Sequence, residues 1–205
     1  MIYIYKCLVN LAAILIVPVL PLIWLVSKKR RHTVLKRLGL STGFDPAGKN
    51  QKRVWIHALS VGEIRSVYPL VALLNRRYPG LQIVMTTTTQ TGHQMAENLF
   101  LSGGSPMIVQ LGFFPFDLGW VIRNVSKKIN ADAVIIVETD IWPNFLYELN
   151  KKAVPVILVN ARLSRRSLNG YLRVKSFINP VFSRLSKILV QSRTDRQRYL
   201  KLGLG

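Results

Sequence analysis

The chain has 205 residues, enough for one α/β domain with an appended segment and too few for two full domains. Its 29 lysines and arginines against 9 aspartates and glutamates give a formal net charge of +20 at pH 7. Such a charge favours anionic partners, namely nucleic acid, phosphorylated ligands or an anionic membrane surface. The single cysteine, Cys7, excludes an intrachain disulfide and fits a reducing compartment.

An apolar run stands near the N-terminus. Residues 7–26 (CLVNLAAILIVPVLPLIWLV) carry no charge, and 20 residues are about the length of a membrane-spanning helix. Cations at 28–37 outnumber those before the run, which predicts that the C-terminal part is cytoplasmic. We expect a retained N-terminal membrane anchor over residues 1–27. There are two alternatives. One is a cleaved signal peptide, and the other is a segment kinked at Pro18 and Pro21 that lies in the membrane interface.

The remainder divides into a linker and an alternating region. Residues 28–52 are basic and, from residue 38, rich in glycine and proline, which predicts a juxtamembrane linker. From Arg53, apolar runs alternate with helical patterns, and this predicts a Rossmann-like α/β domain over 53–205, with helices on both faces of a parallel sheet. The predicted strands are 54–59, 81–85, 107–111, 133–137, 154–159 and 188–190. The predicted helices are 63–78, 91–101, 117–129, 141–152, 164–182 and 192–202.

The first strand-turn-helix contains a candidate site. Ser60, Gly62 and Glu63 follow the first predicted strand, at the edge where open α/β sheets bind ligands. Ser60 and Glu63 have the spacing of a capping box, in which Glu63 accepts the Ser60 N–H. Placed within reach of a substrate hydroxyl, the same carboxylate can act as a general base. The residues alone leave both interpretations open.

The second predicted strand ends in a threonine-rich run, residues 86–92 (TTTTQTG). Hydroxyls and a glycine at the start of a helix suit an oxyanion or sugar hydroxyls, and Thr89 is the candidate ligand here. Thr91 and Gln94 also have capping-box spacing, so the run can serve the helix alone.

Two further strand ends carry chemistry. The aromatic stretch 113–117 (FFPFD) either is exposed and binds an acyl or sugar surface, or packs into the fold as a plug. Asp117, which ends it, is a predicted helix N-cap. After the fourth strand, Glu138 and Asp140 stand beside Trp142. Two carboxylates with a tryptophan suit carbohydrate binding, although Asp140 can simply cap the next helix.

Three arginines follow the fifth strand. Arg162, Arg165 and Arg166 surround a predicted helix start, where the helix dipole disfavours cations and a bound phosphate would compensate. The alternative is a solvated basic face. The histidines show no metal-ligand spacing, and His57 is predicted to be a core residue.

Four motifs together point to a family. HALSVGE (57–63), TTTTQTG (86–92), ETDIWPN (138–144) and NARLSRRS (160–167) resemble, in this order, motifs of the 3-deoxy-D-manno-octulosonic acid (Kdo) transferases. These are membrane-associated glycosyltransferases of lipopolysaccharide synthesis. The resemblance covers the N-terminal run and residues 53–204, and departs at Asp140, where glutamate is expected. It implies a GT-B fold, in which an N-terminal Rossmann-like domain serves the acceptor and a C-terminal one the donor.

The resemblance also implies the activity. Kdo would pass from CMP-Kdo to a lipid A precursor (lipid IVA) at the cytoplasmic face of the inner membrane, without a metal or other cofactor. Glu63 corresponds to the family's proposed general base. The acceptor-binding candidates are Ser60, Gly62, Thr89, Glu138, Asp140, Arg162, Arg165 and Arg166.

The chain stops where the family continues into its donor-binding domain, so we expect a fragment that meets CMP-Kdo through that missing domain. One alternative is a non-catalytic, membrane-attached binding module for an anionic lipid or sugar phosphate. A nucleic-acid-binding protein fits the charge, but the sequence has no helix-turn-helix, zinc-finger or RRM signature, and no nucleic-acid partner is expected.

Overall fold

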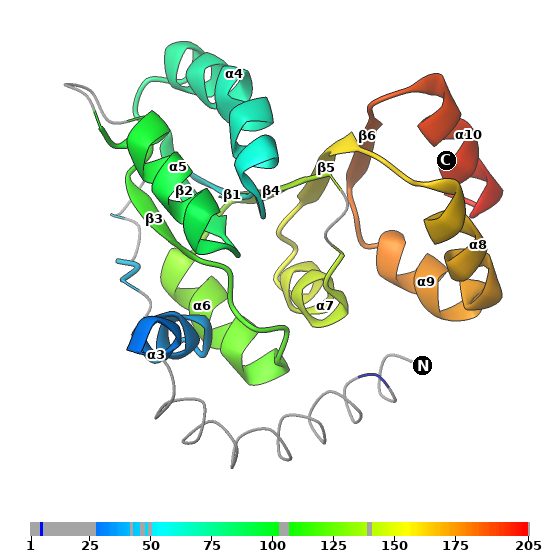
Figure 1. Cartoon of the computed structure of the whole chain (residues 1–205), viewed down its shortest axis with the longest axis horizontal. Helices are drawn as coiled ribbons and strands as arrows, with labels where there is room; N and C mark the ends of the chain where they lie inside the picture. Colours follow the sequence, from blue (N-terminus) through cyan, green and yellow to red (C-terminus); the bar gives the residue numbers. More distant parts are fainter. Residues whose placement is uncertain are drawn as a thin grey trace.

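The computed structural model describes residue 5 and residues 28–41, 43–45, 48, 51–102, 107–138 and 141–204 (Figure 1). The predicted anchor over residues 1–27 lies outside this description, apart from Tyr5. None of the described helices has the length and apolar character that crossing a bilayer requires.

Six strands form a parallel sheet in the order β3-β2-β1-β4-β5-β6. Along the chain, β2 and β3 are added on one side of β1. The chain then crosses over, and β4, β5 and β6 are added on the other side of β1. The carboxyl ends of β1 and β4 therefore flank a topological switch point, where open α/β sheets bind ligands. The predicted parallel sheet is confirmed. The strands are β1 (Arg53–His57), β2 (Gln82–Thr87), β3 (Gln110–Phe113), β4 (Ala133–Val137), β5 (Val156–Ala161) and β6 (Lys187–Val190).

Helices cover both faces of the sheet (Figure 1). Helices α4 and α5 cover one face, α6 and α7 cover the other, and α8 to α10 surround the β6 end. The described helices are α3 (Lys28–Arg37), α4 (Val61–Arg77), α5 (Gln90–Phe100), α6 (Gly119–Ile129), α7 (Pro143–Lys151), α8 (Arg165–Arg173), α9 (Lys175–Phe182) and α10 (Arg193–Lys201).

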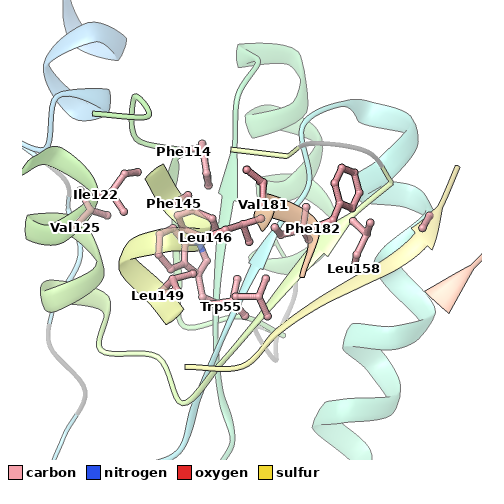
Figure 2. Close-up of a cluster of buried hydrophobic side chains, with 14 of the residues drawn as sticks. Trp55, Phe114, Ile122, Val125, Phe145, Leu146, Leu149, Leu158, Val181 and Phe182 are labelled. Carbon is pink, nitrogen blue, oxygen red and sulfur yellow. The ribbon is translucent and has the colours of Figure 1, made fainter. Parts of the chain in front are cut away.

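Both faces of the sheet are buried under helices, so the side chains on both sides of each strand are apolar. This explains why the strands appear in the sequence as continuous apolar runs. Successive residues point to opposite sides: Trp55 packs in the core under α6 and α7, and Ile56 in the core under α4 and α5. Figure 2 shows the first core, where the Trp55 and Phe145 rings meet edge to face with centroids 4.9 Å apart.

Three segments differ from the prediction. The strand expected over 107–111 begins three residues later, as β3 (Gln110–Phe113). The single helix expected over 164–182 is two helices, because the backbone of Val174 (φ −120°, ψ 32°) breaks it. The break lets α9 turn Ile178 and Phe182 into the core. The linker expected over 28–52 contains helix α3. It also contains Phe44, whose buried ring packs directly on Gly112, so that an added Cβ on Gly112 would clash with the ring.

Candidate active site

Glu63 lies in the first turn of α4, just past the carboxyl end of β1, and its carboxylate binds the two residues that precede the helix. Ser60 is the N-cap of α4, and its Oγ accepts the Glu63 N–H at 3.4 Å. One carboxylate oxygen of Glu63 accepts the Leu59 N–H at 2.7 Å, and the other accepts the Ser60 hydroxyl at 3.1 Å. The predicted capping arrangement is present, with one correction: the side chain reaches the N–H of Leu59 rather than that of Ser60.

Thr89 joins the ends of β2 and β1. It is the N-cap of α5, where its Oγ1 accepts the Gly92 N–H at 3.0 Å and donates to the Leu59 carbonyl at 3.2 Å. The capping box predicted at Thr91 and Gln94 is therefore wrong, because the helix begins at Gln90, one residue after Thr89. Both backbone groups of Leu59 are thus held, one by Glu63 and one by Thr89.

Two glycines at this edge have different functions. An added Cβ on Gly92 would lie 2.8 Å from Thr89 Oγ1 and 3.1 Å from the Leu59 carbonyl oxygen, so the packing of the two strand ends requires glycine. An added Cβ on the exposed Gly62 would meet only Ser60 Oγ, at 3.9 Å. The described packing therefore leaves open space beside Gly62, one residue before Glu63.

The backbone is left-handed at the ends of β4 and β5. Glu138 has φ 66° and donates its N–H to the Val159 carbonyl at 2.9 Å, and Asn160 has φ 54°. Glutamate seldom adopts such a conformation, and strain of this kind clusters at functional sites. Asn160 was not among the predicted site residues, although the tolerance of asparagine for positive φ is a signal in the sequence. Asp140 lies outside the described residues.

The aromatic stretch 113–117 packs into the fold. Phe113 and Phe114 are buried, and the Phe114 ring stacks on His57 with centroids 3.9 Å apart. His57 is buried, with Nδ1 3.0 Å from the Thr86 carbonyl oxygen. Of the two interpretations, the packed plug is confirmed for these phenylalanines, and His57 is the core residue that we expected.

Asp117 caps a helix, but a different one from the helix predicted. Helix α6 begins after Leu118 without a side-chain cap. Asp117 instead accepts the N–H groups of Asn144 at 3.0 Å and Phe145 at 2.8 Å, in the first turn of α7, and the Tyr5 hydroxyl at 2.8 Å. Burial raises the pKa of the Asp117 carboxyl, and these hydrogen bonds act in the opposite direction.

The three predicted arginines are exposed, as the solvated-face interpretation and the phosphate interpretation both require. Arg165 and Arg166 occupy the first turn of α8, which contains no acidic residue, and neither pairs with a carboxylate among the described residues. The loop that carries these arginines is bonded to α10, because Asp195 of α10 accepts the Leu163 N–H at 2.9 Å.

The structure therefore brings some of the predicted residues together and separates others. Ser60, Glu63 and Thr89 meet around the backbone of Leu59. Glu138 follows β4, the direct neighbour of β1 across the switch point. The arginines follow β5, two strands from β1, or roughly 10 Å away at the ~4.8 Å spacing of strands.

Solved structures share this fold. A UDP-GlcNAc 2-epimerase from Neisseria meningitidis, bound to UDP-GlcNAc, superposes with a TM-score of 0.53 at 11% identity, over 75% of this chain and 44% of that chain. Another UDP-N-acetylglucosamine 2-epimerase gives a TM-score of 0.52 at 14% identity, over 74% and 45%. At these identities the likeness concerns the fold alone.

Sequence relatives are more specific. A 3-deoxy-D-manno-octulosonic acid transferase of Haemophilus influenzae is 35% identical over 150 residues, which are 73% of this chain and 34% of that protein. One from Chlamydia pneumoniae is 28% identical over 205 residues, 98% of this chain and 46% of that protein. The chain thus spans less than half the length of these relatives. The sequence profile of the 3-deoxy-D-manno-octulosonic-acid transferase (kdotransferase) family matches residues 32–205, and the chain belongs to this family.

Proposed function

We propose that this chain is the acceptor-binding part of a glycosyltransferase that transfers Kdo from CMP-Kdo to a lipid A precursor (lipid IVA) in lipopolysaccharide synthesis. Family membership supports the class of reaction. The observation that carries the proposal is the position of Glu63, at the carboxyl end of β1 beside the switch point. The donor binds in this proposal to a second Rossmann-like domain of a GT-B enzyme, which fits the greater length of the relatives.

In the proposed reaction Glu63 takes the proton of an acceptor hydroxyl while the hydroxyl oxygen attacks the anomeric carbon of Kdo. The new glycosidic C–O bond forms, the C–O bond to the phosphate of CMP breaks, and CMP leaves with the bonding electrons. Attack from the face opposite CMP inverts the anomeric centre. The N-terminus of a helix favours negative charge, so the first turn of α4 suits a carboxylate, and no metal or other cofactor is part of the proposal.

The acceptor sugar would occupy the open space beside Gly62. Ser60 and Thr89 are hydroxyl side chains at this place, and Glu138 lies across the switch point, so the sugar meets hydrogen-bonding groups from several strand ends. Asp140, which follows Glu138 by two residues, belongs to the same proposal.

Arg162, Arg165 and Arg166 would bind the phosphates of the acceptor or the anionic headgroups of the inner membrane, at its cytoplasmic face. Two observations support this: the side chains are exposed, and Arg165 and Arg166 form no ion pair with another described residue. The separation of roughly 10 Å from β1 suits an acceptor that is larger than one sugar ring.

Glu63→Gln tests the catalytic proposal. Glutamine also serves at the third position of a capping box but cannot take a proton, so the two functions of Glu63 separate. In a version that carries a donor-binding domain, we expect a nearly unchanged melting temperature and a rate lower by about 10²–10⁴-fold. The matched control is Glu97→Gln, on the exposed side of α5, which should leave both unchanged. A transfer rate close to wild type in Glu63→Gln would assign Glu63 to the cap alone.

A non-catalytic, membrane-attached binding module for an anionic lipid or sugar phosphate is the second candidate. The exposed arginines favour it as much as they favour the enzyme. Binding of the lipid A precursor without transfer, in a version that also binds CMP-Kdo, would decide for the module.

A further inference from the structure

The Ser60 hydroxyl is bonded both to the carboxylate and to the backbone of Glu63. Its Oγ donates to one carboxylate oxygen, Oε1, at 3.1 Å and accepts the Glu63 N–H at 3.4 Å. A serine hydroxyl has one proton to donate and two lone pairs that accept. Glu63 therefore uses the proton and one lone pair, and these two bonds leave the second lone pair of Oγ for another donor.

The two carboxylate oxygens of Glu63 have different surroundings. Oε2 accepts the Leu59 N–H at 2.7 Å, and the Leu59 carbonyl in turn accepts the Thr89 hydroxyl at 3.2 Å. Oε2 is thus bonded to backbone that the end of β2 holds in place. Oε1 is bonded to a hydroxyl, which can give up one proton while it receives another. A proton that reaches Glu63 through Ser60 therefore arrives at Oε1.

The Ser60 hydroxyl borders the open space beside Gly62. An added Cβ on Gly62 would meet Ser60 Oγ at 3.9 Å. Glu63 is only 8% exposed, whereas Ser60 is half-buried. An acceptor sugar in this space therefore meets the more exposed of the two side chains, and that side chain is already bonded to the carboxylate.

We propose that Ser60 is a catalytic residue that relays the proton of the acceptor hydroxyl to Glu63. This inference rests on the proposed function and deepens it. As the acceptor oxygen attacks the anomeric carbon of Kdo, its proton passes to Ser60 Oγ, and the original Ser60 proton passes to Oε1 of Glu63. Ser60 ends as a neutral hydroxyl and Glu63 as a neutral acid. CMP leaves with the electrons of the broken C–O bond, so the relay needs no further reactant.

Two substitutions of Ser60 separate the relay from the helix cap. Asparagine caps a helix about as well as serine but has no hydroxyl to pass a proton on, whereas threonine keeps the hydroxyl. In the version that carries a donor-binding domain, we expect Ser60→Asn to melt like wild type and to lose about 10²-fold in kcat. Ser60→Thr should restore most of that loss. A raised KM with unchanged kcat in Ser60→Asn would assign Ser60 to acceptor binding alone and overturn the relay.

Ser192→Asn is the matched control. Ser192 is the N-cap of α10, where its Oγ accepts the Asp195 N–H at 3.1 Å and donates to the Asp195 carboxylate. The same pair of bonds therefore recurs at the end of β6, three strands from β1. The same substitution there should leave kcat unchanged. An equal loss of kcat in both variants would show a general effect of the cap and refute the relay.

A solvent isotope experiment counts the protons that move. In mixtures of H₂O and D₂O, kcat of wild type should fall along a curve, because the relay moves two hydroxyl protons in the same step. A straight line for wild type would contradict the relay. Glu63→Gln keeps the two proposals apart. If that variant is slow and Ser60→Asn has wild-type kcat, the relay alone is refuted; if Glu63→Gln is as fast as wild type, the proposed base is refuted.

Discussion

Asp117 accepts the backbone N–H of Phe145 at 2.8 Å, although 28 residues separate them in the sequence. The first turn of α7 has no cap from its own N-cap residue, Trp142. The loop before α6 supplies that cap, and α7 in turn follows the strand end that carries Glu138. Asp117 therefore supplies the side-chain cap of the helix that follows this part of the candidate site.

Asp117→Asn should destabilise the protein. Asparagine has one acceptor oxygen in place of two, so the N–H of Asn144 or Phe145 loses its partner, and an unsatisfied buried donor costs about 1–3 kcal/mol. Urea unfolding measures the change. Glu97→Gln is the control, because Glu97 is exposed on α5; its effect should stay within about 0.5 kcal/mol. Equal stability of both variants would show that α7 does not depend on the carboxylate.

Gly92→Ala should destabilise the protein by about 1–3 kcal/mol, since the new methyl group would overlap Thr89 Oγ1 and press on the Leu59 carbonyl. Thermal unfolding gives the measurement. Gly170→Ala in α8 is the matched control: an added Cβ meets nothing within 4 Å there, and alanine should stabilise the helix by up to about 1 kcal/mol. A neutral Gly92→Ala would mean that the ends of β1 and β2 can move apart at little cost.

Stability should depend on pH through Asp132. A hydrogen bond from Lys52, followed by one from the Arg53 N–H, lowers the pKa of this carboxyl below its usual 3.8. A lowered pKa in the folded state gives stability that is present above pH 3.8 and is lost as the pH falls through the lowered value. The advantage of wild type over Asp132→Asn in unfolding experiments should therefore shrink below that pH. A difference that stays constant from pH 7 to pH 3 would contradict this assignment.

The replacement of Arg162, Arg165 and Arg166 by Gln should weaken binding to anionic vesicles and flatten its dependence on salt. Folding should not change, because the side chains are exposed. The control replaces Arg76, Arg77 and Lys127 by Gln. These side chains are also exposed, and their replacement removes the same amount of charge from other helices. Equal losses in both variants would indicate a general effect of net charge rather than a site.

The sequence predicts the sheet well because the strands of a parallel sheet are buried on both faces. Runs such as 133–137 are therefore apolar throughout and bounded by polar residues. It also places Ser60, Glu63 and Thr89 correctly at strand ends, since these positions follow from the strand-turn-helix pattern. It does not predict the partners of Asp117 or the bond from Thr89 to Leu59, because both join residues that only the folded chain brings together.

The left-handed backbone of Glu138 has a consequence for engineering. Glycine adopts this conformation without steric cost, so a library selected for thermal stability alone would favour Glu138→Gly and discard the carboxylate at the switch point. A library selected for sugar transfer would retain the acid if the proposed site is correct. Stabilisation and activity would then compete at this single position, and variants should be screened for both properties together.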